Sequence, residues 1–95
     1  MPIERKLAAI MFTDIAGYTA LSAKDSTKAS ELLTTQRDTL KPIVEKHGGS
    51  WMKEMGDGLL LTFDSATSAV ECSIAIQEAT KDLEDLNLLV SMKVK

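Results

Sequence analysis

The sequence lacks three features that would each point to a particular class of protein. It has a single cysteine, Cys72, so no disulfide can form within the chain, which suits a reducing compartment. It has no excess of basic residues: 11 Lys and Arg stand against 14 Asp and Glu, and the net charge of −3 argues against nucleic-acid binding. Its apolar run Leu7–Phe12 is too short for a signal sequence or a membrane span. We therefore expect a cytoplasmic chain without a membrane segment.

The composition that is present is ordinary for a globular domain. Hydrophobic residues make up 44% of the 95 residues and charged residues 26%. This length supports one domain with one hydrophobic core. We find no repeat, low-complexity tract or linker, so we expect residues 1–95 to form a single domain.

The first half of the sequence predicts a strand followed by a long helix. The continuous apolar run Leu7–Phe12 is typical of a central strand covered on both faces. Asp25 or Ser26 can cap a helix that ends at His47–Gly49, and Pro42 should kink or divide it. The apolar stripe of this helix comprises Ala29, Leu32, Leu33, Gln36, Leu40, Ile43 and Val44.

The second half predicts a hairpin, a helix and a last strand. Ser50–Met55 and Leu59–Phe63 flank Gly56-Asp57-Gly58, and an Asp-Gly pair between strand-like runs is a strong hairpin signal. A second helix follows Asp64 or Ser65. Its shared face comprises Ala66, Ala69, Cys72, Ser73, Ile76, Ala79 and Leu83. The last strand is indicated by the alternating residues Val90, Met92 and Val94. The strand methionines expected to fill the core are Met11, Met52, Met55 and Met92.

The order of these elements predicts the fold class. It reads strand, helix, strand, strand, helix, strand, which is the ferredoxin-like split βαβ arrangement (β-α-β-β-α-β). The fold is therefore expected to be α+β, an antiparallel sheet with helices on one face. In this arrangement the first two strands run parallel to each other, and the third lies between them in the opposite direction.

This topology places two carboxylates at one edge of the sheet. Asp14 follows the first strand and Asp57 follows the second, and the carboxyl ends of parallel strands meet at the same edge. Two adjacent carboxylates repel each other unless a cation neutralises them, and Mg²⁺ or Mn²⁺ prefers oxygen ligands. The loop Ile15–Thr19 leads into a helical start, so its backbone N–H groups could receive phosphates. The sequence thus predicts a metal and triphosphate site.

A simpler interpretation stands beside this one. An aspartate after a strand is usually a cap or turn residue, and Asp-Gly in a hairpin needs no function. For Asp14 or Asp57 alone, turn chemistry is the stronger explanation. The presence of both at one edge of this topology favours function.

Three segments resemble the catalytic domain of class III nucleotidyl cyclases, the family that makes cyclic AMP or cyclic GMP. Leu7–Thr19 is similar to the first metal segment of that family, and Lys53–Gly58 resembles its second metal hairpin. Arg37, Pro42 and His47–Gly49 follow the usual ending of its long helix. The resemblance runs through almost the whole chain.

The resemblance implies a metal-dependent adenylate cyclase. Asp14 and Asp57 would be the catalytic residues and would bind two Mg²⁺ or Mn²⁺ ions, with the Ile15 carbonyl as a further metal ligand. Lys53 occupies the base-contacting position, where adenylate cyclases carry Lys and guanylate cyclases typically carry Glu, so ATP is the implied substrate; Glu54 lies one position further on. The implied substrate-binding residues are Lys53, Ile15, Ala16, Gly17, Tyr18, Thr19 and Gly56.

The resemblance also implies a partner chain and a missing segment. Family members work as head-to-tail dimers, so we expect a homodimer or a partner cyclase chain. The family domain is longer, and its second base-contacting residue, an Asn and an Arg lie beyond the last strand of this chain. The alternative function is therefore a non-catalytic cyclase-homology module for dimerisation or regulation. A diguanylate cyclase is disfavoured because Met55-Gly56-Asp57-Gly58-Leu59 does not match its hairpin.

Overall fold

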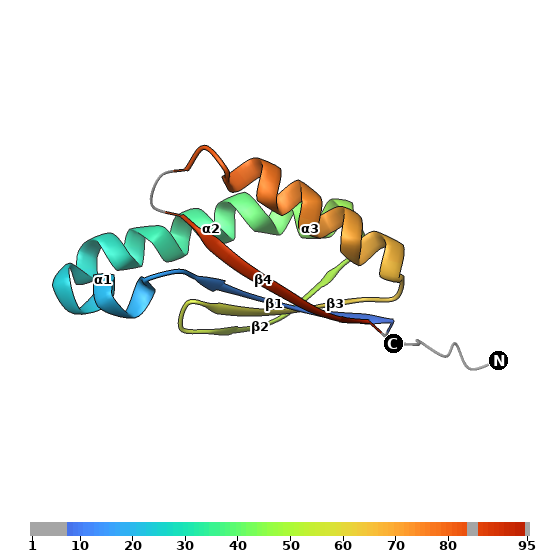
Figure 1. The fold of residues 1–95 in the computed structure, drawn as a ribbon, viewed down its shortest axis with the longest axis horizontal. Coiled ribbons are helices and arrows are strands. Elements are labelled where there is room, and N and C mark those ends of the chain that lie inside the picture. Colours follow the sequence, from blue (N-terminus) through green and yellow to red (C-terminus); the bar gives the residue numbers. More distant parts are fainter. Residues whose placement is uncertain (1–7, 84–85, 95) are drawn as a thin grey trace.

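The computed structural model of this chain describes residues 8–83 and 86–94. Two long helices cover one face of a four-stranded sheet, and a short helix lies against the first of them at the end of the sheet (Figure 1). The described residues leave the other face of the sheet uncovered (Figure 1). The elements are β1 (Ala9–Ile15), α1 (Tyr18–Lys24), α2 (Ser26–Lys46), β2 (Ser50–Met55), β3 (Gly58–Phe63), α3 (Ala66–Thr80) and β4 (Leu88–Val94). Within these described residues, no helix is long and apolar enough to cross a membrane.

The sheet has the strand order β2-β3-β1-β4, and all neighbouring strands are antiparallel. This confirms the α+β split βαβ prediction, with β3 between β1 and β2. The hairpin turn and the end of β1 that leads into α1 lie at the same end of the sheet (Figure 1). The predicted first strand began at Leu7, which lies outside the described residues.

The core lies between the sheet and the two long helices. Strand β1 is buried on one face only, with Met11 and Thr13 buried and Phe12 and Asp14 exposed, so the prediction of a strand covered on both faces is wrong. The main core cluster comprises Ala9, Met11, Leu40, Val44, Leu59, Leu61, Phe63, Ala69, Cys72 and Ile76. A smaller cluster of Ile15, Leu32 and Leu86, against which Tyr18 packs, lies beside the loop after β1.

Helix α2 is continuous, so Pro42 does not divide it, and the alternative expectation of a kink at Pro42 stays a prediction. Pro42 stands in the last turns, and its missing N–H removes a single intrahelical bond while the buried stripe around Leu40 and Val44 keeps its packing. Asp25 caps the start: its Oδ1 accepts from the Lys28 amide at 3.1 Å. The helix ends before Gly48, which has a φ of 72°.

Two further expectations are wrong. Met52 and Met55 do not fill the core: they are 57% and 47% exposed, because β2 is an edge strand that pairs only with β3. Helix α3 ends at Thr80, so Leu83 lies beyond it and is 37% exposed, and Ala79 is exposed as well. Thr80 is buried in their place, with its hydroxyl donating to the Ile76 carbonyl at 2.9 Å.

Candidate active site

The structure brings Asp14 and Asp57 together at one end of the sheet. The Asp57 Oδ2 accepts a hydrogen bond of 3.0 Å from the backbone N–H of Ile15, the residue after Asp14. Asp14 belongs to β1 itself, because β4 pairs with β1 as far as Ile15. The carboxylate of Asp14 lies over the hairpin: an added Cβ at Gly58 would stand 3.0 Å from its Oδ1. The two acidic residues, 43 positions apart, therefore belong to one site.

The hairpin turn is supported from beneath by a residue outside the motifs that predict the site. Gln36 of α2 is 2% exposed, and its Nε2 donates to the Asp57 carbonyl at 3.4 Å. Gly56 supplies the positive φ of 61° that the turn requires. Gln36 stands out in the sequence only as a polar residue on an apolar helical stripe, and that is the signal that could have found it.

Two hydroxyl or amide oxygens beneath the site have no hydrogen-bond partner among the described residues. They are Thr13 Oγ1 and Gln36 Oε1, and both are buried. Thr13 precedes Asp14 and Gln36 contacts Asp57, so both lie directly next to the acidic pair. Buried polar atoms in native proteins are normally satisfied by protein groups, ordered water or a bound ion, so these two atoms can accept a further polar partner.

The backbone amides of the loop after β1 are partly engaged. The Ile15 amide donates to Asp57, and the Ala16 amide donates to the Asn87 carbonyl at 2.7 Å. Gly17, with a φ of 75°, is the N-cap of α1, whose first intrahelical bond runs from the Leu21 amide to the Gly17 carbonyl. The first helical amides, those of Tyr18 and Thr19, have no intrahelical acceptor. A phosphate contact by this loop would therefore use Gly17–Thr19 rather than the amides of Ile15 or Ala16.

Lys53 and Glu54 lie in different environments although they are adjacent in β2. Lys53 is exposed and pairs with Leu60 across the hairpin. The Glu54 carboxylate accepts from Arg37 Nε at 3.0 Å and Arg37 Nη2 at 2.7 Å, and its Oε2 also accepts from Trp51 Nε1 at 3.1 Å. The hydrogen bond from Arg37 lowers the pKa of Glu54, and the hydrogen bond to Glu54 raises the pKa of Arg37.

The donor set fits a divalent cation that shares its coordination with a substrate. Within residues 8–83 and 86–94, no group of three or more His, Cys, Asp or Glu side chains could hold a metal ion by itself. Two neighbouring carboxylates are present, and Mg²⁺ is commonly bound by one or two carboxylates together with substrate phosphates. The Ile15 amide engages one oxygen of Asp57, and Asp14 is exposed, so the pair keeps carboxylate oxygens that could bind a ligand.

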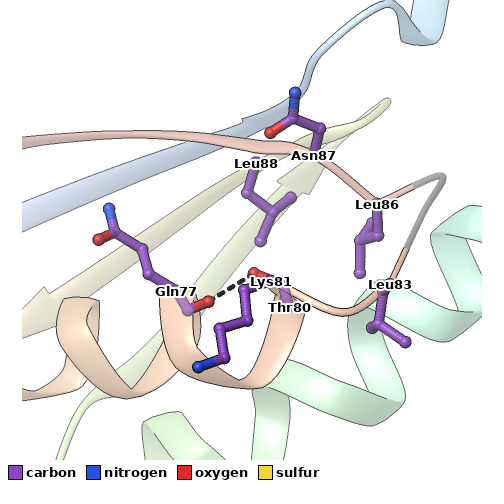
Figure 2. A pocket seen from close by; sticks show the side chains of 7 residues that line it. All are labelled: Gln77, Thr80, Lys81, Leu83, Leu86, Asn87 and Leu88. Carbon is purple, nitrogen blue, oxygen red and sulfur yellow. Dashed lines mark hydrogen bonds between the residues drawn. The ribbon is translucent and has the colours of Figure 1, made fainter.

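A cavity of about 390 Å³ lies at the junction of α3 and β4, apart from the acidic pair. Figure 2 shows that it is lined by the apolar side chains of Leu83, Leu86 and Leu88 and by the polar ones of Gln77, Lys81 and Asn87. Neither Asp14 nor Asp57 lines it. Its connection to the site is the Asn87 carbonyl, which holds the Ala16 amide.

Several known proteins similar to this chain are named nucleotide cyclases, and one, 34% identical over 73% of the chain, is named a serine/threonine-protein kinase of Myxococcus xanthus. No protein-family model matches the sequence. Over 78 residues, 81% of the chain, it is 42% identical to a putative adenylate cyclase of Rhizobium meliloti strain 1021, of which the match covers 13%. An adenylate/guanylate cyclase/hydrolase from Silicibacter pomeroyi superposes with a TM-score of 0.81 at 30% identity, over 97% of this chain and 58% of that one. An adenylyl cyclase from P. aeruginosa superposes with a TM-score of 0.79 at 25% identity, over 99% of this chain and 57% of that one.

The matched proteins are longer than this chain. The chain spans just over half of the two solved cyclase chains and a much smaller share of the Rhizobium protein. The match includes both the sheet and its helices, since nearly the whole chain is superposed. By sequence and by fold, the chain belongs to the class III adenylyl and guanylyl cyclase family and corresponds to part of one cyclase domain.

Proposed function

We propose that this chain forms part of a metal-dependent adenylate cyclase that converts ATP into cyclic AMP and pyrophosphate. The observation that carries the proposal is the juxtaposition of the two acidic turns, in which the Ile15 amide donates to Asp57 and the Asp14 carboxylate lies over Gly58. This arrangement holds two carboxylates at the exposed end of the sheet. A structural turn needs only one of them.

In the proposed reaction, the 3′-hydroxyl of ATP attacks the α-phosphorus. A new bond forms between the 3′-oxygen and phosphorus, the bond to the pyrophosphate oxygen breaks, and the hydroxyl proton is released. Asp14, Asp57 and the Ile15 carbonyl would hold Mg²⁺ or Mn²⁺. Two such ions, when bound, would neutralise the triphosphate and favour ionisation of the 3′-hydroxyl.

The residues of the chain position the reacting groups. The Ile15 amide fixes one oxygen of Asp57, and Gln36 holds the backbone of the same residue. The start of α1, from Gly17 to Thr19, would orient the distal phosphates. Gly56 lets the turn close tightly beside them.

The proposed choice of ATP depends on Lys53. Its ammonium group is exposed and is a donor without acceptor capacity, so it suits the N1 acceptor of adenine and not the N1–H donor of guanine. The similar solved proteins include adenylyl and guanylyl cyclases, so the fold by itself leaves the base open. The 42% identical relative carries the name of a putative adenylate cyclase, which supports ATP.

The proposal includes a second chain and a cytoplasmic location. The sheet face that carries Lys53 and Asp14 is open, and in a head-to-tail dimer the Lys53 of one copy would face the acidic pair of the other. The partner would be a second copy or another cyclase chain. The buried, free Cys72 suits the reducing cytoplasm, where ATP is present.

The test combines metal binding with product detection. The purified chain is titrated with Mn²⁺ in the presence of ATP or GTP, followed by electron paramagnetic resonance, and the products are identified by mass spectrometry. We expect cyclic AMP from the native chain, and a loss of about 10²-fold or more in Asp14→Asn and Asp57→Asn. Asp64→Asn, which changes an exposed acid outside the site, serves as the matched control.

Two outcomes would redirect the proposal. Mn²⁺–ATP binding that survives both Asp14→Asn and Asp57→Asn would contradict the assigned site. Binding that depends on both residues but gives no cyclic product would instead support the alternative, a cyclase-like module for dimerisation or regulation.

A further inference from the structure

Strand β2 presents two neighbouring residues of opposite charge to opposite faces of the sheet. Lys53 pairs with Leu60, which lies on the open face between the buried residues Leu59 and Leu61. Glu54 pairs with Leu59, which is 2% exposed and faces the helices. Because side chains alternate along a strand, a shift of β2 by one residue would exchange the two faces. Glu54 would then stand on the open face.

The register of β2 is not fixed by burial. Among the described strands it pairs with β3 alone, at the edge of the sheet, and Trp51 is its one partly buried residue. Its pairing already contains an irregularity, since Trp51 pairs with Leu61 and Lys53 with Leu60, which leaves Met52 as an extra residue. The two-residue turn at Gly56–Asp57 sets the register at the hairpin end of β2. Lys53 and Glu54 lie between this turn and the bulge, and they would exchange faces if the extra residue moved from Met52 into the turn. Contacts in addition to the core packing of Trp51 must therefore keep the extra residue at Met52.

The contacts of Glu54 supply that restraint. Arg37 binds both carboxylate oxygens, at 3.0 and 2.7 Å, and so attaches β2 to α2. Trp51 donates its indole N–H to the same carboxylate at 3.1 Å, and this bond spans the extra residue Met52. Trp51 also packs against the main core. The contacts on both sides of the bulge therefore converge on a single carboxylate, which faces away from Lys53.

We propose that Arg37, Glu54 and Trp51 form a register lock that keeps Lys53 on the open face and thereby sets a preference for ATP over GTP. The preference rests on the proposed function, in which Lys53 contacts the base. In the shifted register, the Glu54 carboxylate would take that place. It is an acceptor, so it suits the N1–H and amino donors of guanine. Arg37 is thus a positioning residue that acts through its neighbours on β2.

The first measurement reports the register without reference to activity. The native chain and Arg37→Met are compared by two measurements. One is the cross-strand nuclear Overhauser contact between Lys53 and Leu60, and the other is the hydrogen exchange of the β2 amides. We expect the variant to lose protection in β2 and to weaken the Lys53–Leu60 contact. Lys46→Met removes an exposed cation from the same helix and should leave both unchanged. An unaltered β2 in Arg37→Met would overturn the lock.

The second measurement reports the preference. The dissociation constants of the Mn²⁺ complexes of ATP and GTP are determined for each variant by calorimetry. Arg37→Met should lower the preference for ATP by about fivefold, the scale of one exposed ion pair with good geometry. Arg37→Lys, which cannot bind both oxygens at once, should give a smaller loss. We expect part of the lower preference in Arg37→Met to be a gain in GTP affinity. This gain should disappear in Arg37→Met/Glu54→Gln, because the Glu54 carboxylate that would contact guanine is then absent.

The outcomes separate this inference from the proposed function. If Arg37→Met leaves the preference for ATP over GTP unchanged while Lys53→Ala changes it, the specificity role of the Arg37–Glu54–Trp51 lock is overturned. The cyclase proposal would still stand. A native chain that binds neither nucleotide would overturn the proposed function and the specificity role together. The β2 contacts and exchange rates would still decide whether the lock exists. If the Arg37–Glu54 ion pair is only structural, its removal in Arg37→Met should lower stability without changing the ratio of the ATP and GTP affinities.

Discussion

The two faces of the sheet differ in what their side chains do. On the face beneath the helices, Met11, Leu61 and Phe63 are at most 1% exposed and form the main core. On the opposite face, the same strands present Phe12, which is 39% exposed, and Asp14. Because strands alternate with a period of two, each strand contributes to both faces at once. Alternate residues of each strand therefore serve different purposes. Those on the covered face stabilise the fold, and those on the open face include the candidate site residue Asp14.

This division explains why the acidic pair can exist in so small a domain. Asp14 is flanked in sequence by the buried residues Thr13 and Ile15, which fix the backbone that carries it. The burial cost of a charge is avoided because the carboxylate itself stays on the open face. Substitutions on one face should therefore change stability, and substitutions on the other should change ligand binding.

The largest expected effect is on the covered face. Phe63→Ala removes a ring that is 1% exposed and should lower the free energy of unfolding by about 3–5 kcal/mol, through lost burial and the cavity left behind. Phe12→Ala removes the same side chain from the open face and should cost about 1 kcal/mol or less. Urea denaturation of both variants measures the difference. Equal costs would contradict the division between the faces.

The next effect concerns the open face alone. Gly58→Ala would place a Cβ 3.0 Å from Asp14 Oδ1 and 3.2 Å from the Met55 carbonyl oxygen, so the flexible carboxylate must move. We expect Mn²⁺ affinity to fall about tenfold, which corresponds to ~1.4 kcal/mol. In the Asp14→Asn background the same change should have no further effect on affinity, because the displaced group is already altered. Additive losses in the double variant would show that Gly58 acts elsewhere.

The fold could be predicted from the sequence because its signals are local. The apolar run of β1, the turn at Gly56-Asp57 and the period of α2 each determine one element, and the chain order then determines the topology. The neighbourhood of Asp14 and Asp57 follows from that topology, since parallel strands end at the same edge. Their metal-binding roles stay a prediction.

The parts that could not be predicted depend on tertiary neighbours. The exposure of Met52 and Met55 follows from the edge position of β2, which their hydrophobicity does not report. The engagement of the Ala16 amide depends on Asn87, 71 positions away, and is invisible in the loop sequence. Gln36 looks like an interruption of an apolar stripe until the hairpin is placed above it.

A smaller effect on stability is expected for Gln36 of α2, which contacts the hairpin that carries Asp57. Gln36→Met removes the 3.4 Å hydrogen bond to the Asp57 carbonyl and also removes an amide oxygen that has no partner among the described residues. These changes oppose each other, so the free energy of unfolding should shift by about 1 kcal/mol or less. Mn²⁺ affinity should nevertheless fall, because Asp57 loses its support. Leu33→Met, a partly buried position on the same helix, is the control. A large stability loss with unchanged affinity would make Gln36 a core residue only.

The smallest effect at neutral pH is expected at Cys72, deep under the covered face. Burial raises the pKa of its thiol from 9.0 to about 11, so at pH 8 the native chain should react far more slowly with a thiol reagent than the urea-unfolded chain. The same shift has a consequence for stability. Because the folded chain holds the proton more tightly, its stability is fully present below pH 9 and falls as pH rises from 9 to about 11. Cys72→Ala lacks this titration, so the difference between the two pH profiles isolates it from the lysines. Equal reaction rates of Cys72 in the native and unfolded chains would show that the helices move away from the core often enough to expose the thiol. The covered face would then be more accessible than its packing indicates.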